Sequence, residues 1–152
     1  MVINKKYKGL IDEGWRYKIE GDIETTEELE IDLDKGLYVS GSIKTGEYIK
    51  AGGFIEAGEY IKAGGFIEAG WFIKAGGSIE AGEMIRADFS IEVQGEITIE
   101  DKEHKIFAGL YENPIIKCTK LNAEIGYGKL ELIETETDDE TEEAIITKRK
   151  RV

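Results

Sequence analysis

The sequence predicts an all-β, single-domain protein that folds as a three-sided parallel β-solenoid, a hexad repeat with an 18-residue coil, followed by a non-repeating C-terminal β cap. Three observations support this fold class. Isoleucine recurs every six residues, alanine and glycine follow it at fixed offsets, and the residue after it alternates between Lys and Glu. The chain has 152 residues, 19 glycines and one proline, which suits one domain with many tight corners.

The isoleucine row marks the strands. Isoleucine stands at every sixth position from residue 43 to residue 97, and Ile31 and Leu37 extend the row toward the N-terminus. A small or aliphatic residue, most often alanine, follows two positions later. Side chains two apart share a strand face, so each hexad turns Ile and Ala inward and a Lys or Glu outward. Glycines after the alanines supply the corners, where a positive φ is often required.

Helices and hairpins fit this pattern poorly. A period of six is not a multiple of 3.6, and Gly-Gly pairs at 52–53, 64–65 and 76–77 would break a helix. A hairpin turning at the first of these pairs would place Lys50 opposite Ile55, so that a charge would share a face with a core residue. Parallel stacking keeps every isoleucine above another isoleucine.

The alternation of charge predicts the length of the coil. Two hexads per coil would stack Lys50 on Lys62 and would form like-charge pairs throughout. Three hexads per coil instead form opposite pairs: Lys50 with Glu68 and then Arg86, Glu56 with Lys74 and then Glu92, and Lys62 with Glu80. The exception is the like pair Lys44 over Lys62. Each cross-strand pair is worth about 0.2–1 kcal/mol, so the sum favours three hexads per coil.

The domain boundaries follow from the limits of the repeat. The repeat core is predicted at 31–99, about four coils, and the alternating stretch 15–24 is expected to form the first coil or an N-terminal cap. Residues 105–134 have strand-like runs without the hexad, and we expect them to cap the end of the stack, because a bare sheet edge invites polymerisation. The domain therefore covers 1–134.

The end of the chain, 135–152, is charged, first acidic and then basic, and is predicted to be a disordered tail at least in part.

The charge balance restricts the partners. Asp and Glu number 32 and Lys and Arg 20, a net charge of −12. Such a surface repels nucleic acid and anionic membranes and favours basic protein partners, although solubility alone also accounts for it. The N-terminus lacks the apolar run of a secretory signal, and no stretch has the roughly 18 apolar residues of a membrane span. We therefore expect a cytoplasmic protein that binds neither nucleic acid directly nor a membrane.

The sequence predicts no catalytic, cofactor-binding or metal-binding residues, and therefore no enzyme and no cofactor. A single cysteine, Cys118, forms neither an intramolecular disulfide nor an all-cysteine metal site, and its apolar context is typical of a buried residue. The single histidine, His104, lies in a charged segment beyond the repeat. Hexapeptide acyltransferases also have three-sided coils, but they need a histidine base and a small residue two positions before the aliphatic one, where this chain has Glu, Gly or Trp.

Aromatic residues often precede the isoleucines and should point outward, as the Lys and Glu side chains do. With three hexads per coil they form two columns. The predicted partner-binding residues are Tyr48, Phe66 and Met84 in one column, Phe54 and Phe72 in the next, and Trp71 and Phe89 at the adjoining corner. An exposed aromatic column is costly unless something covers it. The alternative is an intramolecular ladder of rings that stabilise one another.

Two resemblances accompany these patterns. The stretch "YVSGSIKTGEYIKAGGFIEAG" (38–58) is similar to the Gly- and Ile-rich cores of bactofilins, bacterial cytoskeletal proteins that form β-helices and polymerise end to end. That likeness covers about half of the chain and ends after residue 101. The IKAG/IEAG repeats followed by "KIFAGL", "IKCTKL" and "YGKLELIE" resemble small uncharacterised proteins of Firmicute prophages and mobile elements, over most of the chain. This second likeness implies a phage or accessory context.

Two functional hypotheses follow. The first is a non-catalytic protein-interaction module, in the form of a phage or mobile-element inhibitor (anti-defence, anti-CRISPR-like) that binds a basic, nucleic-acid-handling protein through an acidic and aromatic solenoid surface. The alternative is a self-assembling, bactofilin-like structural scaffold. A homo-oligomer is compatible with both hypotheses, because the chain itself is a candidate partner.

Overall fold

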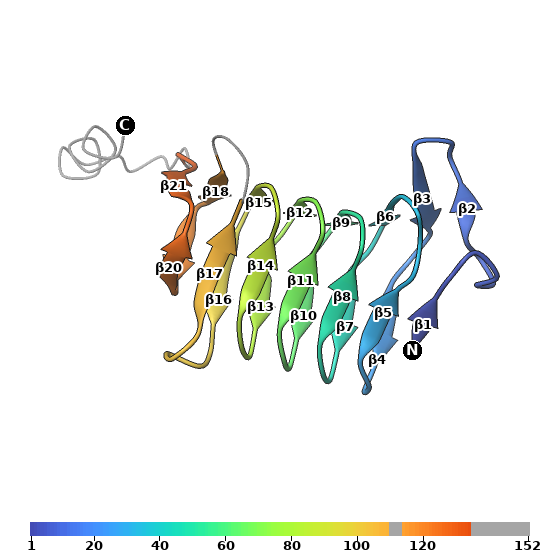
Figure 1. The fold of residues 1–152 in the computed structure, drawn as a ribbon, viewed down its shortest axis with the longest axis horizontal. Helices are drawn as coiled ribbons and strands as arrows, with labels where there is room; N and C mark the ends of the chain where they lie inside the picture. Colours follow the sequence, from blue (N-terminus) through green and yellow to red (C-terminus); the bar gives the residue numbers. More distant parts are fainter. Residues whose placement is uncertain (110–113, 135–152) are drawn as a thin grey trace, which may run out of the picture.

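The computed structural model describes residues 1–109 and 114–134. Over these residues the chain winds into a three-sided β-solenoid, whose coils follow one another along the long axis of the molecule (Figure 1). The predicted fold class is therefore confirmed. The described part contains no helix, and hence none long and apolar enough to cross a membrane.

Three sheets, named A, B and C here, form the three sides. Sheet A has seven strands in the order β1 (Val2–Ile3), β5 (Leu29–Ile31), β8 (Ile49–Ala51), β11 (Ile67–Ala69), β14 (Ile85–Ala87), β17 (Lys105–Ala108) and β20 (Glu124–Tyr127). Sheet B has eight: β2 (Ile11–Asp12), β3 (Arg16–Ile19), β6 (Gly36–Val39), β9 (Ile55–Ala57), β12 (Ile73–Ala75), β15 (Ile91–Val93), β18 (Ile115–Cys118) and β21 (Lys129–Leu132). Sheet C has six: β4 (Ile23–Thr25), β7 (Ile43–Thr45), β10 (Ile61–Ala63), β13 (Ile79–Ala81), β16 (Glu96–Ile99) and β19 (Lys120–Asn122).

Each hexad forms one short strand with the predicted alternation. In β11, Ile67 and Ala69 are buried, and Glu68 between them points outward. Ile67 lies between Ile49 and Ile85 in parallel register, three hexads along the chain from each. Each isoleucine of the repeat from 43 to 97 is fully buried, so a continuous apolar column fills the inside of the solenoid.

The outward ladders follow the predicted register, including the predicted exception. Lys50 pairs with Glu68, and Glu68 with Arg86, while Lys62 lies between Lys44 and Glu80. Lys62 Nζ lies 3.6 Å from a Glu80 carboxylate oxygen. Both side chains are well exposed, so this pair contributes little to stability, and the ladders act mainly by disfavouring other registers.

The corner glycines are required for a reason other than the expected one. The glycines with positive φ among the described residues lie outside the hexads: Gly9, Gly14, Gly21, Gly109 and Gly128. Within the repeat, glycine is required at the stacked corners because the neighbouring coil leaves no room for a Cβ atom. A Cβ at Gly64 would overlap the carbonyl oxygen of Gly46, and a Cβ at Gly82 would overlap that of Gly64. Successive corners therefore stack backbone on backbone, and a side chain would push them apart.

The number of coils and the start of the row differ from prediction. The solenoid has about six coils rather than about four, because both ends extend it. In addition, Leu29, and not Ile31, lies under Ile49, so this coil is longer than three hexads. Five residues, 32–36, separate Ile31 from the inward Leu37, whereas three residues separate the alanine from the next isoleucine in the repeat, and Leu33 is buried within this longer segment. The row of isoleucines therefore shifts by two residues at this corner.

The N-terminal end combines a first coil with a cap. As expected, residues 15–24 contribute to the first coil, in β3 and β4. Ahead of them β2 pairs antiparallel with β3, with Ile11 opposite Lys18, at the end of sheet B (Figure 1). The other strand pairs of the described sheets are parallel. This antiparallel strand covers an edge of sheet B that a further parallel strand could otherwise extend.

The C-terminal segment 105–134 lies at the predicted end and is β-structured without the hexad, yet its strands lengthen the three sheets instead of crossing over them. Ile106 lies on Ile85, Ile116 on Ile91 and Leu130 on Ile116. The first two of these coils are longer than three hexads, and the third is shorter. The predicted disordered tail, 135–152, lies outside the described residues.

Candidate protein-binding surface

Side chains suited to catalysis or metal binding are scattered in the described residues. No three His, Cys, Asp or Glu residues there lie close enough to hold a metal ion. Cys118 is fully buried, as its apolar context predicted, and burial raises the pKa of its thiol to about 11. The thiol therefore stays protonated at neutral pH, which makes it a poor nucleophile. His104 follows a turn, with its Nδ1 3.0 Å from Asp101 Oδ2.

The first predicted aromatic column lies along the edge of sheet A. Tyr48 and Phe66 stack face to face, with ring centroids 4.8 Å apart and planes at 4°. The Tyr48 hydroxyl donates a hydrogen bond of 2.9 Å to Glu30 Oε1, and this bond raises the pKa of Tyr48. Met84 follows one coil further along, and all three side chains of the column are half-buried. The column is thus both an internal ladder and a flat apolar strip on the surface.

The second column contains one correction. Phe54 and Phe72 stack with centroids 4.5 Å apart, as predicted, but Phe54 is only 4% exposed. Its ring lies outside the isoleucine core, over Gly36, between Phe72 and Trp15. Phe54 was predicted to contact a partner, and this was wrong: neighbouring outer side chains cover it. Trp15, which is 64% exposed, was not among the predicted site residues, because it precedes the hexads; it lies in the adjoining corner column, and its ring centroid is 6.1 Å from that of Phe54.

The corner between sheets A and B carries an exposed aromatic pair, Trp71 and Phe89, named the aromatic corner here. Trp71 is 56% and Phe89 42% exposed. Their ring centroids are 6.1 Å apart and their planes are tilted by 58°, so the two rings pack against each other in a tilted arrangement. The Phe89 amide donates a hydrogen bond of 3.0 Å to the Trp71 carbonyl oxygen, which fixes the two corners one above the other. A hollow of about 380 Å³ adjoins them, lined also by Phe72, Lys74 and Glu92.

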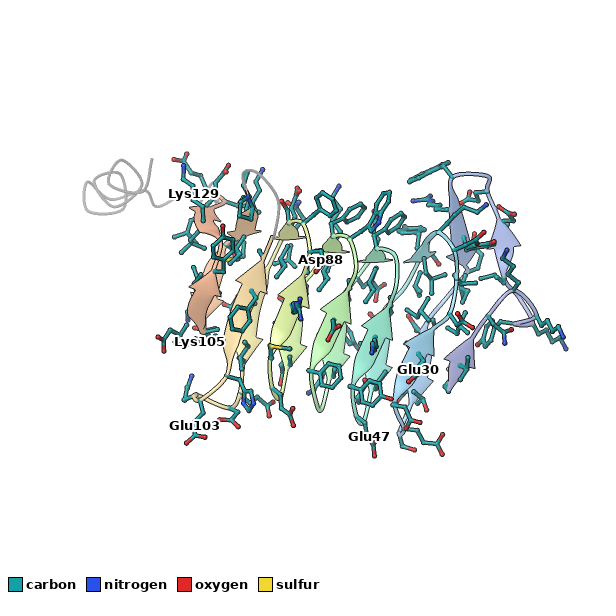
Figure 2. The ribbon with its side chains drawn as sticks, in the orientation of Figure 1. Glu30, Glu47, Asp88, Glu103, Lys105 and Lys129 are labelled. Carbon is teal, nitrogen blue, oxygen red and sulfur yellow. The ribbon has the colours of Figure 1, made fainter. Side chains whose placement is uncertain are left out.

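The opposite corner, between sheets C and A, carries a line of carboxylates that the sequence reasoning did not identify. This acidic ridge consists of Glu27, Glu47, Glu83 and Asp101, with Gly65 as its gap. Backbone hydrogen bonds connect three of these positions, from the Gly65 amide to the Glu47 carbonyl oxygen at 3.0 Å and from the Glu83 amide to the Gly65 carbonyl oxygen at 3.2 Å, while the Asp101 amide donates to the Gly82 carbonyl oxygen at 3.1 Å. Figure 2 shows Glu47 and Glu103 at this lower corner and Asp88 at the upper one. The signal is present in the sequence, because 47, 65, 83 and 101 lie three hexads apart, but the sequence prediction stacked only strand positions and the aromatic residues beside them.

The structure therefore separates the predicted site residues into two groups that border the same sheet. Tyr48, Phe66 and Met84 lie beside the acidic ridge, on one long edge of sheet A. Trp71 and Phe89 lie at the other long edge, with Phe72 on the adjoining margin of sheet B. The outer face of sheet A lies between the two groups and carries the alternating ladder from Glu30 through Lys50 and Glu68 to Arg86. Sheet A and its two corners form one continuous candidate surface.

Sheet C offers a different kind of surface. A hollow of about 630 Å³ surrounds Tyr60, which is 43% exposed. Its walls carry charges of both signs, with Lys44 and Lys62 beside Glu59 and Glu80. Since these charges compensate one another within the hollow, it favours neither an anionic nor a cationic ligand.

No family model, no curated protein and no solved structure matches this sequence. The resemblances to bactofilin cores and to prophage repeat proteins therefore stay predictions. The charged and aromatic residues of sheet A and its two corners are the basis for a functional proposal.

Proposed function

We propose that this protein is a non-catalytic binding module that docks against a basic surface of another protein through sheet A and its two corners. The acidic ridge is the observation that carries the proposal. Four carboxylates line one corner over five successive coils, and the gap among them is a glycine. The two end carboxylates lie beside basic groups, Glu27 3.8 Å from the N-terminal ammonium and Asp101 3.0 Å from His104 Nδ1, so Glu47 and Glu83 form the centre of the ridge. A line of one charge sign creates a field that steers an oppositely charged partner into place.

The rigidity of the solenoid makes this ridge effective. Hydrogen bonds between coils run from the Gly65 amide to the Glu47 carbonyl oxygen and from the Glu83 amide to the Gly65 carbonyl oxygen. The positions of Glu47 and Glu83 are therefore set before binding, and binding requires little further ordering. Coils stack about 4.8 Å apart, and a DNA strand carries one phosphate per about 3.4 Å. With the gap at Gly65 counted, the ridge carries one carboxylate per about 6 Å, which is somewhat more than half the charge density of a DNA strand.

A regularly spaced line of negative charges on a rigid edge supports a more specific form of the proposal, an inhibitor that occupies the nucleic-acid-binding surface of a basic protein. The net charge of −12 acts in the same direction. The predicted likeness to proteins of prophages and mobile elements is compatible with such an inhibitor, since host defence proteins that handle nucleic acids present basic channels.

The aromatic side chains would supply the contact energy. Interfaces combine apolar anchors, often Trp, Tyr or Phe, with a charged rim, and a few anchors carry most of the affinity. Trp71 and Phe89 are exposed enough to act as such anchors, and the strip of Tyr48, Phe66 and Met84 adds flat apolar area beside the ridge. Phe54 has no part in this contact, because it is covered.

The ridge is tested by comparing two charge-matched variants. In the first, Glu27, Glu47 and Glu83 are replaced by Gln, and in the second, Glu24, Glu96 and Glu131, which are exposed elsewhere, are replaced by Gln. Immobilised wild-type chain is exposed to a bacterial lysate at low and at high salt, and mass spectrometry identifies the proteins retained. We expect a basic protein that salt and the ridge variant release and the control variant retains. Equal retention by both variants would contradict the proposal.

The alternative, a self-assembling scaffold, is favoured by one observation at the C-terminal end. Among the described residues, β19 and β21 end their sheets, and the inward-facing Leu121, Ile125, Leu130 and Leu132 are only partly buried. Such an end could stack against another copy. Light scattering with negative-stain imaging of the purified protein separates the two functions: long filaments favour the scaffold, and a monodisperse small species favours the binding module.

A further inference from the structure

The side of the solenoid that sheet C forms lacks a ring that the repeat supplies on the other two sides. The segment "AGGFIE" occurs at 51–56 and at 63–68, whereas 75–80 reads "AGGSIE". These three segments lead into β9 of sheet B, β11 of sheet A and β13 of sheet C. Ser78 therefore takes, on sheet C, the position that a phenylalanine takes on each of the other two sheets.

The serine leaves Tyr60 without the stacking partner that the equivalent tyrosine of sheet A has. On sheet A, Tyr48 is followed three hexads later by Phe66, and the two rings stack with centroids 4.8 Å apart. On sheet C, Tyr60 is followed three hexads later by Ser78, whose carbonyl oxygen accepts a hydrogen bond of 3.0 Å from the Ile61 amide. Among the described residues, no aromatic ring stacks on Tyr60, and no hydrogen bond involves its hydroxyl. Tyr60 is 43% exposed, whereas Tyr48 and Phe66 are half-buried.

The hollow of about 630 Å³ on sheet C adjoins Tyr60 on the side where the ring of the following coil would stack. Its lining comes from the coil of Tyr60, within 58–62, and from the following coil, within 76–80, together with Lys44 of the preceding coil. Because the lining residues of the following coil include two adjacent glycines, few side chain atoms fill the space beside the ring. The volume lies in the range of about 300–1,000 Å³ that is typical of small-molecule sites.

The polar groups around the hollow suit a neutral ligand with many hydroxyl groups. Two ammonium groups and two carboxylates contribute to the lining, from Lys44, Lys62, Glu59 and Glu80, and their formal charges cancel. An ammonium group only donates hydrogen bonds and a carboxylate only accepts them, whereas a hydroxyl does both. A sugar ring with hydroxyls around its edge can therefore use both kinds of group at once. The pair of Lys62 and Glu80, 3.6 Å apart, is well exposed, so a ligand can replace it at small cost.

From these observations we infer that the hollow on sheet C binds a neutral carbohydrate, and that one sugar ring stacks on Tyr60 as Phe66 stacks on Tyr48. The C–H groups on one face of a sugar ring carry a slight positive charge and the face of an aromatic ring is negative, so the two faces attract each other. A nucleobase would also stack on Tyr60, but the net charge of −12 repels the phosphate groups of a nucleotide. The inference does not depend on the proposed function, because the hollow lies on sheet C and not on sheet A.

The test titrates four neutral tetrasaccharides calorimetrically against the full chain at millimolar concentration: cellotetraose, maltotetraose, laminaritetraose and tetra-N-acetylchitotetraose. We expect at least one of them to bind. Ser78→Phe should abolish this binding, because the new ring would stack on Tyr60 and occupy the place of the sugar ring, as Phe66 does on Tyr48. Ser78→Ala is the matched control, since it removes the same hydroxyl but does not fill the hollow, and it should retain the binding.

A second pair of variants tests the ring of Tyr60 itself. Tyr60→Ala should weaken the binding by about 3- to 10-fold, because the stacking contact is lost. Tyr127→Ala, which removes an exposed ring on β20, should leave it unchanged. Circular dichroism checks that each variant keeps the wild-type fold. We expect Ser78→Phe to fold, because two other copies of its hexad carry phenylalanine at this position.

Several outcomes would overturn the inference. One is that none of the four tetrasaccharides binds the wild-type chain. Equal affinities of Ser78→Phe and Ser78→Ala would show that the sugar does not lie beside Tyr60. Tighter binding of a sulfated heparin tetrasaccharide would assign the hollow to an anionic ligand held by its two lysines. Binding of adenosine without binding of any tetrasaccharide would assign the ring of Tyr60 to a nucleobase.

Discussion

The middle of the solenoid and its C-terminal coil are built by the same three sheets but by different rules. In the middle, every coil takes three hexads, every inward isoleucine is fully buried and glycine occupies the tight corners. In the C-terminal coil the chain length between stacked residues varies in both directions, and a bulge shifts the pairing between Ile106 and Phe107. The parallel pairing persists although the repeat that would predict it has ended.

This difference shows that two separate requirements hold a parallel solenoid together. Backbone hydrogen bonds between coils need only an extended segment in the right place, whereas exact stacking of side chains and corners needs the repeat. The middle meets both requirements. The C-terminal part meets the first alone: Ile106 and Ile116, which later strands cover, are still fully buried, whereas the inward residues of the last strands are only partly buried, namely Leu121, Ile125, Leu130 and Leu132. Four changes test this comparison.

The largest effect is expected from truncating the shared isoleucine ladder. Ile67 and Ile125 occupy the same inward position of sheet A, but Ile67 is fully buried and Ile125 only partly. Ile67→Ala should lower the free energy of unfolding by about 2–5 kcal/mol, because it removes buried methyl groups and leaves a cavity. Ile125→Ala should cost clearly less. Chemical denaturation measures both, and equal losses would mean that the last coil is as well packed as the middle.

The next effect concerns the corners. Gly64 follows an alanine of sheet C, and Gly52 follows an alanine of sheet A. A Cβ at Gly64 would overlap the Gly46 carbonyl oxygen, whereas a Cβ at Gly52 would meet no atom within 4 Å. Gly64→Ala should cost about 1–3 kcal/mol, since the coils must separate. Gly52→Ala should be neutral or should stabilise the protein by up to about 1 kcal/mol, through the unfolded chain. Thermal unfolding of this pair would refute the stacking explanation if both variants lost the same stability.

The same two requirements explain how much the sequence could predict. The hexads and the charges predicted the three sheets, the coil of three hexads and the like pair of Lys44 and Lys62, because each register error would have cost several side-chain contacts at once. The two extra residues in the corner 32–36 left no periodic signal, and Ile31 was therefore assigned the inward position that Leu29 occupies. Residues 105–134 were expected to cover the end of the stack, since nothing in their pattern indicated which strands they would join.

The candidate surface was predictable to a similar extent. The outward direction of the aromatic residues follows from strand alternation, and Trp71 and Phe89 were placed correctly at a corner. The burial of Phe54 was not predictable, because it depends on Trp15, a residue from a different coil and outside the repeat. The acidic ridge was missed for another reason: the sequence prediction stacked only strand positions and the aromatic residues beside them, and turn residues also stack when coils are identical in length.

A smaller effect is expected from reversing one charge in the regular ladder. Lys74 lies between Glu56 and Glu92, so Lys74→Glu would create two like-charge contacts and should cost about 0.4–2 kcal/mol. Lys129→Glu is the matched control in the last coil, because its partner across the sheet is the uncharged Ile115. The loss for Lys74→Glu should shrink at high salt. Denaturation at two salt concentrations would argue against a role for the ladder if both reversals behaved alike.

The smallest effect concerns pH, at the boundary between the two regions. Glu100 follows the last regular strand of sheet C. A hydrogen bond with the Glu80 carboxylate, together with the negative charge of Glu80, raises the pKa of Glu100. A carboxyl whose pKa is higher in the folded state favours the protonated form there, so its charged form lowers stability at neutral pH, and this penalty disappears as the pH falls through the raised pKa. Glu100→Gln should therefore slightly raise the Tm at pH 7 and leave it unchanged near pH 3. Because Glu96→Gln removes an exposed carboxylate at the other end of the same strand, a gain of equal size for that variant would attribute the effect to net charge and not to the Glu80–Glu100 contact.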